Sequence, residues 1–162
     1  MFFSGPLPGS PAPSAPAADP ALADLSLKAE RIIRVLVTDV RGQWDTTPDG
    51  HRVIHSYVTC KVANALKGPQ GDTLTLRLLG GRVGRARMEV LEVPEFSVGE
   101  EAVLFIAGNG RVFCPVVGGE AGRYRIVRSG AGTCAVQRPD GRSAGSVNEF
   151  ERQIELQLKA KS

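Results

Sequence analysis

The sequence predicts a mainly β fold, an antiparallel barrel or sandwich with a short helix before it and a packed helix after it. Roughly seven or eight short apolar runs recur at intervals of about 8–12 residues, as in barrels and sandwiches. Turn signals such as Asp49-Gly50 and Gly108-Asn109-Gly110 separate some of these runs. No internal repeat and no alternation of strands with helices is visible, which argues against a doubly wound parallel sheet.

Length and composition fit a single domain that neither spans a membrane nor carries a clustered basic surface. The chain has 162 residues, and a hydrophobic fraction of 42% is enough for one sizeable core. No run approaches the roughly 20 apolar residues of a membrane span, so we expect no membrane-spanning segment. The net charge of +3 comes from dispersed residues, whereas a phosphate-binding surface usually shows a clustered basic stripe. Aromatic residues are sparse at 6%, and we therefore expect no nucleic-acid partner.

The first 20 residues differ in composition from the rest of the chain. Residues 1–20 are rich in Pro and Ala with almost no charge, which predicts a disordered tether ahead of a single domain over residues 21–160. They lack the basic start and apolar centre of a secretory signal, although Ala15-Pro16-Ala17 has the form of a cleavage site. Either a signal lies upstream or there is none. We favour the first, because such runs are common tethers beside export signals, and expect an extracellular or periplasmic protein.

The first predicted element is a short helix that begins at Asp19, a candidate N-cap. Leu22, Leu25 and Ala29 have the spacing of one apolar helix face. A strand is predicted directly after it, over residues 32–40, because apolar residues alternate there with a period of two. The apolar members of one face are Ile33, Val35 and Val37.

A tight hairpin is predicted at Asp49-Gly50, a pair typical of two-residue β-turns. Residues 52–62 should therefore return antiparallel to the strand at 32–40. Alternate residues of this second strand form a clear apolar face, made of Ile54, Val58, Cys60 and Val62.

Further short strands and a closing helix are predicted for the rest of the domain. The strands span residues 73–79, 88–93, 102–107, 111–117, 122–128 and 133–138. The glycine-rich loop 80–85 is interpreted as a sharply bent connection. The helix spans about residues 146–160, because Ser146 and Glu149 form a capping box ahead of an apolar stripe at helical spacing. That stripe should dock on the strands.

The two histidines are the only candidate metal ligands of note. His51 and His55 are four residues apart on a predicted strand, beside Asp45 and Asp49, and two imidazoles with two carboxylates can hold zinc. No third ligand stands at a fixed spacing, so we interpret both as solvent-facing hairpin residues and expect neither a metal nor a cofactor.

The sequence offers no catalytic machinery, and we expect the protein not to be an enzyme. Three cysteines, Cys60, Cys114 and Cys134, lie in apolar or β-type runs without a CxxC pair. We interpret them as small buried hydrophobes. One disulfide plus a free thiol is the alternative, and nothing near them resembles an activated thiol. No GxSxG elbow occurs for a serine nucleophile.

Binding residues are the remaining functional candidates. Loop 80–85 lacks the Lys-Ser/Thr ending of a P-loop, yet Arg77, Arg82, Arg85 and Arg87 form the densest basic patch of the chain. We expect Arg82, Arg85 and Arg87 to contact an acidic ligand or partner. Trp44 lies beside the first hairpin turn and has two interpretations, an exposed contact residue or a plug over the end of a barrel.

Several segments resemble a set of short exported bacterial proteins of unassigned function. The resemblance covers roughly residues 22–158 and is strongest at residues 59–68, 80–84 and 94–105, which read TCKVANALKG, GGRVG and PEFSVGEEAVLF. That set is similar in layout to netrin-like modules and to the inhibitory domain of tissue inhibitors of metalloproteinases. The resemblance implies a five-stranded antiparallel OB-like (netrin-like) barrel with flanking helices. Those inhibitors chelate zinc through an N-terminal cysteine, and this chain has none before Cys60, so their mechanism does not carry over.

We therefore expect a non-catalytic binding or accessory module. Its partner should be a protein or an envelope polymer, contacted through one barrel face and its loops, which include Trp44 and residues 82–87. Three alternatives stay open. The chain could be a protease-regulating inhibitor, a structural subunit in which edge residues 111–117 extend a neighbour's sheet, or a metal-dependent enzyme.

Overall fold

The computed structural model describes residues 20–130 and 132–161. Two helices flank the strands: α1 (Pro20–Lys28) comes first and α2 (Val147–Lys161) comes last. The strands are β1 (Arg31–Thr46), β2 (Arg52–Lys67), β3 (Thr73–Leu79), β4 (Gly81–Val83), β5 (Ala86–Met88), β6 (Glu101–Ile106), β7 (Arg123–Arg128), β8 (Cys134–Gln137) and β9 (Ser143–Ser146). A 3-10 turn, η1 (Gly119–Gly122), precedes β7. The mainly β class with a helix at each end is confirmed, whereas the predicted tether lies outside the described residues except for Pro20.

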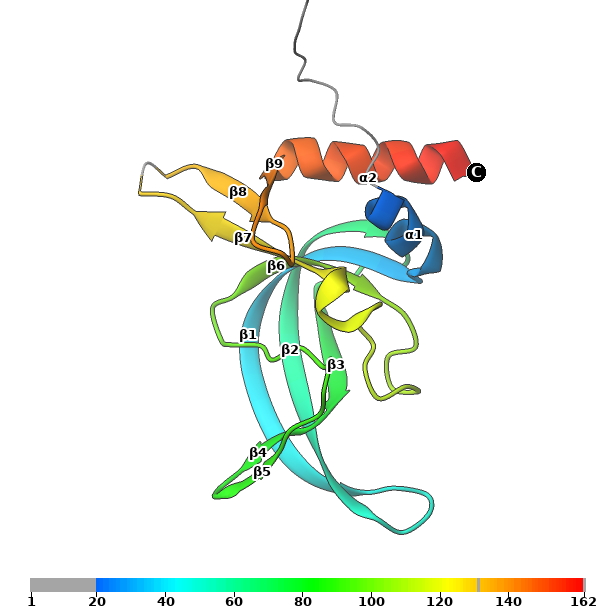
Figure 1. The fold of residues 1–162 in the computed structure, drawn as a ribbon, viewed down its shortest axis with the longest axis vertical. Helices are drawn as coiled ribbons and strands as arrows, with labels where there is room; N and C mark the ends of the chain where they lie inside the picture. Colours follow the sequence, from blue (N-terminus) through cyan, green and yellow to red (C-terminus); the bar gives the residue numbers. More distant parts are fainter. Residues whose placement is uncertain (1–19, 131, 162) are drawn as a thin grey trace, which may run out of the picture.

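One antiparallel sheet of seven strands carries the fold, in the order β3-β2-β1-β6-β7-β8-β9, and β4 and β5 form a separate two-stranded sheet. β1 and β2, each 16 residues long, form the predicted hairpin and curve along their whole length (Figure 1). Three register shifts interrupt their pairing, one of them between Val37 and Asp39. Such bulges increase the twist of a strand, which accounts for the bend. The ladder of the described residues does not close into a barrel.

An irregular segment, residues 107–117, lies between the two ends of the curved part of the sheet. On one side it pairs with β6, where Val117 N–H donates to Phe105 O at 2.8 Å. A hydrogen bond of 2.9 Å from Ala107 N–H to Pro115 O joins the beginning of the segment to its end. On the other side it meets β3, where Leu79 N–H donates to Phe113 O at 2.8 Å. The segment therefore covers the free edge of β3, through this main-chain bond and through the Asn109 side chain, which bonds to Thr75 O and Arg77 N–H.

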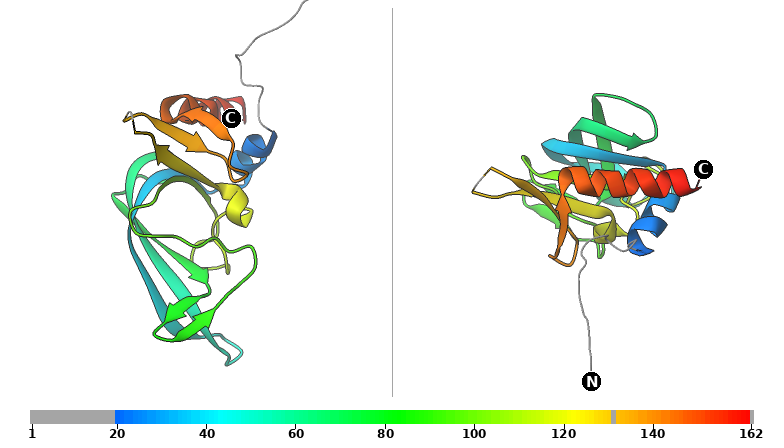
Figure 2. Two further views of the ribbon diagram at one scale, coloured as in Figure 1. Left: turned by 60° about the vertical axis from the view of Figure 1, so that its left-hand side comes forward. Right: turned by 90° about the horizontal axis from the view of Figure 1, so that it is seen from above.

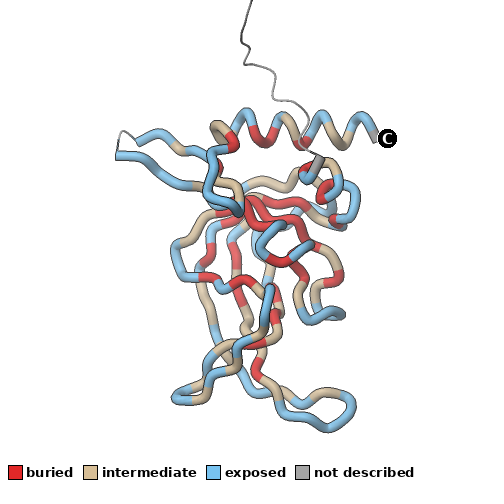
Figure 3. Tube along the Cα trace, in the orientation of Figure 1, coloured by how far each residue is buried: buried red, intermediate tan, exposed pale blue. Residues whose placement is uncertain are grey.

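The core has two parts, one on each side of the sheet. The hollow side of the curved sheet buries a cluster that contains Ile33, Val58, Leu78 and Phe96. The other side is covered by α1 and α2 and buries a second cluster around Phe105 and Phe150. Figure 3 shows the buried residues along the middle of the sheet and beneath the helices, with the hairpin tips exposed.

The closing helix docks as predicted. In α2, Glu149 N–H donates to Ser146 Oγ at 3.2 Å and Ser146 N–H donates to Glu149 Oε1 at 3.1 Å, which is the reciprocal capping box. Phe150 and Ile154 are fully buried. The Phe150 ring lies 4.8 Å from that of Tyr124 on β7, centroid to centroid. Phe150 and Ile154 belong to one buried cluster with residues of α1 and the sheet, and Figure 2 shows α2 lying over this end of the sheet. The candidate N-cap of α1, Asp19, lies outside the described residues.

Two predicted strands are wrong. Of residues 88–93 only Met88 lies in a strand, as the last residue of β5. Leu91 and Glu92 form a turn, and Glu92 has a φ of 67°, which a strand does not adopt. The Glu92 carbonyl lies close to Gly119. Residues 111–117 contain only the isolated bridge between Ile106 and Val116. Pro115 has no N–H to donate there, which limits regular pairing. Three short strands, β4, β5 and β9, were not predicted.

No helix in the described part of the chain has the length and apolar character needed to cross a membrane.

Candidate functional site

The β4–β5 hairpin lies across the hollow face of the sheet. Loop 80–85, predicted as a bent connection, contains β4 and the turn of this hairpin. Gly80 and Gly81 have φ values of 101° and 142°, and they redirect the chain from the end of β3. At the crossing with β1, a Cβ added to Gly42 would lie 1.9 Å from Arg82 O, so only glycine permits this approach.

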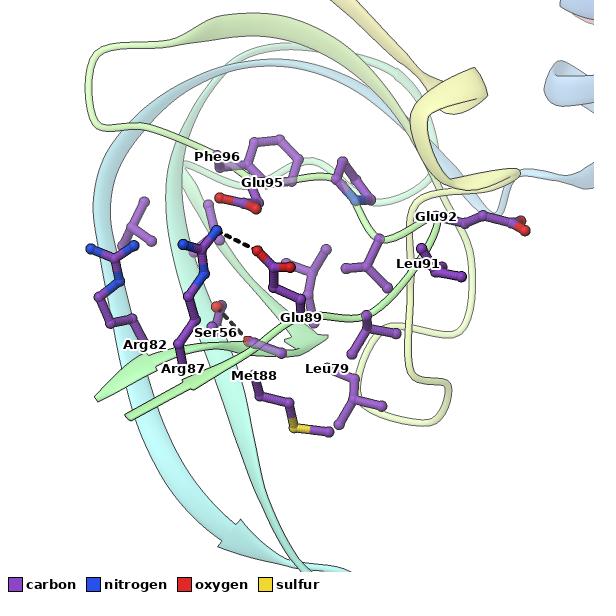
Figure 4. A pocket seen from close by; sticks show the side chains of 18 residues that line it. Ser56, Leu79, Arg82, Arg87, Met88, Glu89, Leu91, Glu92, Glu95 and Phe96 are labelled. Atoms are coloured by element: carbon purple, nitrogen blue, oxygen red, sulfur yellow. Dashed lines mark hydrogen bonds and ion pairs between the residues drawn. The ribbon is translucent and has the colours of Figure 1, made fainter. Parts of the chain in front are cut away.

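Two arginines of the predicted set stand together on this hairpin. Arg82 and Arg87 are paired residues of β4 and β5, so their side chains project on the same side (Figure 4). The Arg87 guanidinium forms an ion pair with Glu89, with Nη2 2.5 Å from Oε1, and both side chains are at least half exposed. Arg82 forms no ion pair with any described residue. One cation of the pair is therefore available to a ligand.

A cavity of about 440 Å³ opens beneath these arginines. This volume lies within the range of about 300–1,000 Å³ that is typical of small-molecule and peptide-side-chain pockets. The floor comes from the sheet and includes Val58 and Leu78, and the opposite wall is the segment 89–96. Apolar side chains predominate in this lining: Val40, Val58, Leu78, Leu79, Met88, Val90, Leu91, Val93, Pro94 and Phe96. The lining thus combines apolar side chains with charged side chains and polar main-chain groups.

Arg123 holds the wall segment in place, although it lies on β7. Its side chain is only 4% exposed, and Nη1 donates to the main-chain carbonyl of Glu95 and, at 3.2 Å, to Oε2 of Glu100. The guanidinium carbon lies 5.1 Å from the centroid of the Phe96 ring. Nη2 also pairs with Glu120 at 2.6 Å. Sequence reasoning missed this residue, because its partners lie up to 28 residues away in the sequence and no local pattern marks them.

The other predicted binding residues lie elsewhere. Arg85 is exposed in the turn between β4 and β5 and does not line the cavity. Arg77, on β3, is the register partner of Tyr57 and also lies outside the lining. Trp44 is 40% exposed near the far end of the β1–β2 hairpin, with the Arg52 guanidinium carbon 4.4 Å from its ring centroid. The plug interpretation does not fit so exposed a side chain, and the role of Trp44 as a contact residue stays a prediction.

The two histidines have separate partners. His51 is 77% exposed in its side chain and pairs with Asp49, 3.0 Å from Nδ1, as the solvent-facing interpretation expects. For His55 that interpretation is wrong, because its side chain is only 14% exposed and Nδ1 lies 2.7 Å from Oδ2 of Asp45. The same Oδ2 accepts a hydrogen bond of 2.7 Å from the Tyr57 hydroxyl. These hydrogen bonds, from Tyr57 first and then from His55, lower the pKa of Asp45.

The residues described by the structure contain no group of three or more His, Cys, Asp or Glu side chains arranged to hold a metal ion. The three cysteines are free thiols. Cys60 is completely buried in the hollow-side core, and this burial raises its pKa to about 12. Burial also raises the pKa of Cys114. Neither thiol has the lowered pKa of a nucleophile.

Neither the protein-family models nor the curated proteins that we searched contain a match to this chain.

Proposed function

We propose that this protein is a non-catalytic binding module that acts outside the cytoplasm on a protein partner or an envelope polymer. The observation that carries the proposal is the pairing of Arg82 and Arg87 at the mouth of an apolar cavity. Concave apolar sites with a few converging polar groups are the usual form of a binding site. The proposed contact surface is formed by the side chains of Arg82 and Arg87 together with the wall segment 89–96, and it does not include the hairpin turn at Arg85.

An OB-like, netrin-like arrangement is part of the same proposal. Its support is the curvature of β1 and β2 and the position of residues 107–117, which hydrogen-bond to β6 on one side and to β3 on the other. In an OB fold one barrel face and its loops form the binding surface. The cavity and hairpin lie on the corresponding hollow side of this sheet.

A structural subunit that extends a neighbour's sheet through residues 111–117 has less support. Those residues lie against β3, and the nearby Asn109 side chain also bonds to this strand. Asn109 Nδ2 donates to Thr75 O at 2.8 Å, and Asn109 Oδ1 accepts from Arg77 N–H at 3.1 Å. The main-chain groups that would pair with a neighbour are partly used within the molecule.

The test is affinity capture with the full-length chain from the secreted and envelope fractions of cells that produce it, followed by mass spectrometry. Arg82→Glu reverses the one cation of the pair that has no internal partner, and Arg85→Glu makes the same change at the turn of the same hairpin. We expect one stoichiometric partner that the Arg82→Glu chain loses and the Arg85→Glu chain keeps. Equal capture by both variants would place the contact surface elsewhere. A captured protease would favour the inhibitor alternative.

A further inference from the structure

We infer that the cavity receives the free C-terminal carboxylate of a partner polypeptide whose last residue is apolar. This inference rests on the proposed function and specifies the chemistry that the site would recognise. It follows from the charges at the mouth of the cavity, from the lining beneath them, and from the groups that would oppose other ligands.

The arginine pair supplies the donors for a carboxylate. A guanidinium presents a planar fork of N–H groups that matches the two oxygens of a carboxylate. Arg82 and Arg87 extend side by side from adjacent strands (Figure 4), and Glu89 already places one carboxylate against Arg87. The Arg82 guanidinium has no such partner among the described residues. A ligand carboxylate can therefore pair with Arg82 without displacing an existing ion pair.

The remaining charges at the site disfavour a ligand with more than one negative charge. Glu89, Glu92 and Glu95 also belong to the cavity lining. Figure 4 shows Glu92 directed away from the cavity, whereas the Glu95 carboxylate lies on the same side as Arg87 and Glu89. The acidic groups would repel a dianionic phosphate more strongly than a carboxylate. Glu95 can instead accept an N–H from the main chain of a bound peptide.

The interior of the cavity suits an apolar side chain next to the carboxylate. Leu79, Met88 and Val90 are partly exposed in its lining, whereas Val58 and Leu78 are fully buried and offer a ligand almost no surface. Main-chain atoms of Gly80 and Gly81 and the rim carboxylates share this lining, so the cavity is not the continuous apolar tunnel that a long acyl chain would need. A polypeptide offers both features at once, an apolar terminal side chain and N–H groups for the rim.

The experiment uses peptides that differ only at the terminus. The probes are N-terminally fluorescein-labelled Gly-Ser-Gly-Ser-Ala-Ala-Z, with Z as Leu, Phe or Asp, each synthesised as the free acid and as the primary amide. Fluorescence polarisation with the full-length chain gives the dissociation constants. We expect the Leu and Phe acids to bind. Amidation should weaken binding by about tenfold or more, because a charged hydrogen bond is worth that much. A terminal Asp should also weaken binding, because it places a second negative charge where the inference puts an apolar side chain.

Matched variants locate the binding. Arg82→Gln should weaken binding of the Leu acid by about tenfold and leave the amide unchanged, whereas Arg85→Gln should alter neither. Both side chains are exposed, so neither variant threatens folding. Acids and amides that bind equally, or no binding by any peptide at about 1 mM, would overturn the inference. Dodecanoate is included as a further probe. If it binds and the peptides do not, the site takes an amphiphile and the inference is wrong.

The two proposals can fail separately. If a captured partner depends on Arg82 but the acid and amide peptides bind alike, the binding module stands and the recognition of a C-terminus falls. If neither peptides nor captured partners distinguish Arg82→Glu from Arg85→Glu, the hairpin surface itself is the wrong site.

Discussion

Tyr57 is joined to Asp45 by a hydrogen bond of 2.7 Å between its hydroxyl and Oδ2. We expect Tyr57→Phe to lower the free energy of unfolding by about 1–2 kcal/mol, because the bond ends on a charged acceptor and the site is partly buried. The variant should also raise the pKa of Asp45 toward its ordinary value of 3.8, since Tyr57 is the largest cause of the lowered pKa. Chemical denaturation and NMR titration of the Asp45 carboxyl measure the two effects. An unchanged Asp45 titration would contradict this account.

The stability that the Tyr57–Asp45 hydrogen bond adds depends on pH, because the bond changes the pKa of both residues. The lowered pKa of Asp45 adds stability that is present above pH 3.8 and is lost as the pH falls through the pKa of the folded protein. The same hydrogen bond raises the pKa of Tyr57 above 10.0, which adds stability that is lost as the pH rises through that raised value. The stability difference between the wild type and Tyr57→Phe should therefore be constant near neutral pH and shrink at both extremes.

The rate at which each cysteine reacts with a thiol reagent should depend on how deeply its side chain is buried. Cys60 is completely buried with a pKa raised to about 12, so a thiol reagent at neutral pH should modify it only after unfolding. Cys134 is partly exposed, and the Arg128 guanidinium lies 3.3 Å from its sulfur. We expect Cys134→Ser to remove one fast-reacting thiol and Cys60→Ser to remove none. Stopped-flow measurement with a chromogenic disulfide reagent gives these rates, and rapid modification of Cys60 in the native protein would contradict the expectation.

At the scale of single elements, the capping box at the start of α2 makes a contribution to stability that can be measured. Ser146→Ala removes the side-chain acceptor of the capping box and should destabilise the protein by about 1 kcal/mol. Asn148→Ala changes a neighbouring exposed residue of the first turn without a capping role and should stay within about 0.5 kcal/mol of the wild type. Thermal and urea unfolding compare the three chains. Equal effects of both substitutions would mean that the cap contributes nothing specific.

Elements with strong local signals could be predicted from the sequence. The β1–β2 hairpin was predictable because Asp49-Gly50 separates two runs with period-two alternation, and α2 because its cap and apolar stripe agree. The β4–β5 hairpin was not, since strands of three residues are too short to show a period. Residues 88–93 look like a strand locally, but the chain turns at Leu91 and Glu92, where the Glu92 carbonyl lies close to Gly119. Local patterns carry no trace of such a distant contact.

The candidate site was predictable only in part, since two of its arginines stood out in the sequence and a third did not. Arg82 and Arg87 stood out as part of a basic cluster, and the structure places them together at one cavity. Their neighbours in sequence, Arg77 and Arg85, were indistinguishable from them until the register of the strands was known. Arg123 gave no signal, because a single arginine at the start of a strand is usually a surface residue. Its importance depends on which segments the fold brings to it.

At the scale of the whole molecule, Arg123 links segments that are far apart in sequence. Arg123→Met should lower the free energy of unfolding by about 3–5 kcal/mol, because it leaves the Glu100 carboxylate, 12% exposed, without its buried partner. Arg125→Met is the matched control. Arg125 approaches the same Glu100 at 3.7 Å but is 51% exposed, and its loss should change stability by only about 0–1 kcal/mol. Urea denaturation measures both, and equal losses would contradict the proposed role.

The position of residues 107–117 along β3 affects how separate molecules behave toward one another. Unpaired strands at the border of a sheet are the sites where copies of a protein join into polymers. Here one border is occupied by the chain itself, and the opposite one, β9, is four residues long. Concentrated solutions should therefore scatter little light over time. Substitutions that detach this segment, such as Asn109→Ala, should favour fibril formation more than core substitutions that cost the same stability.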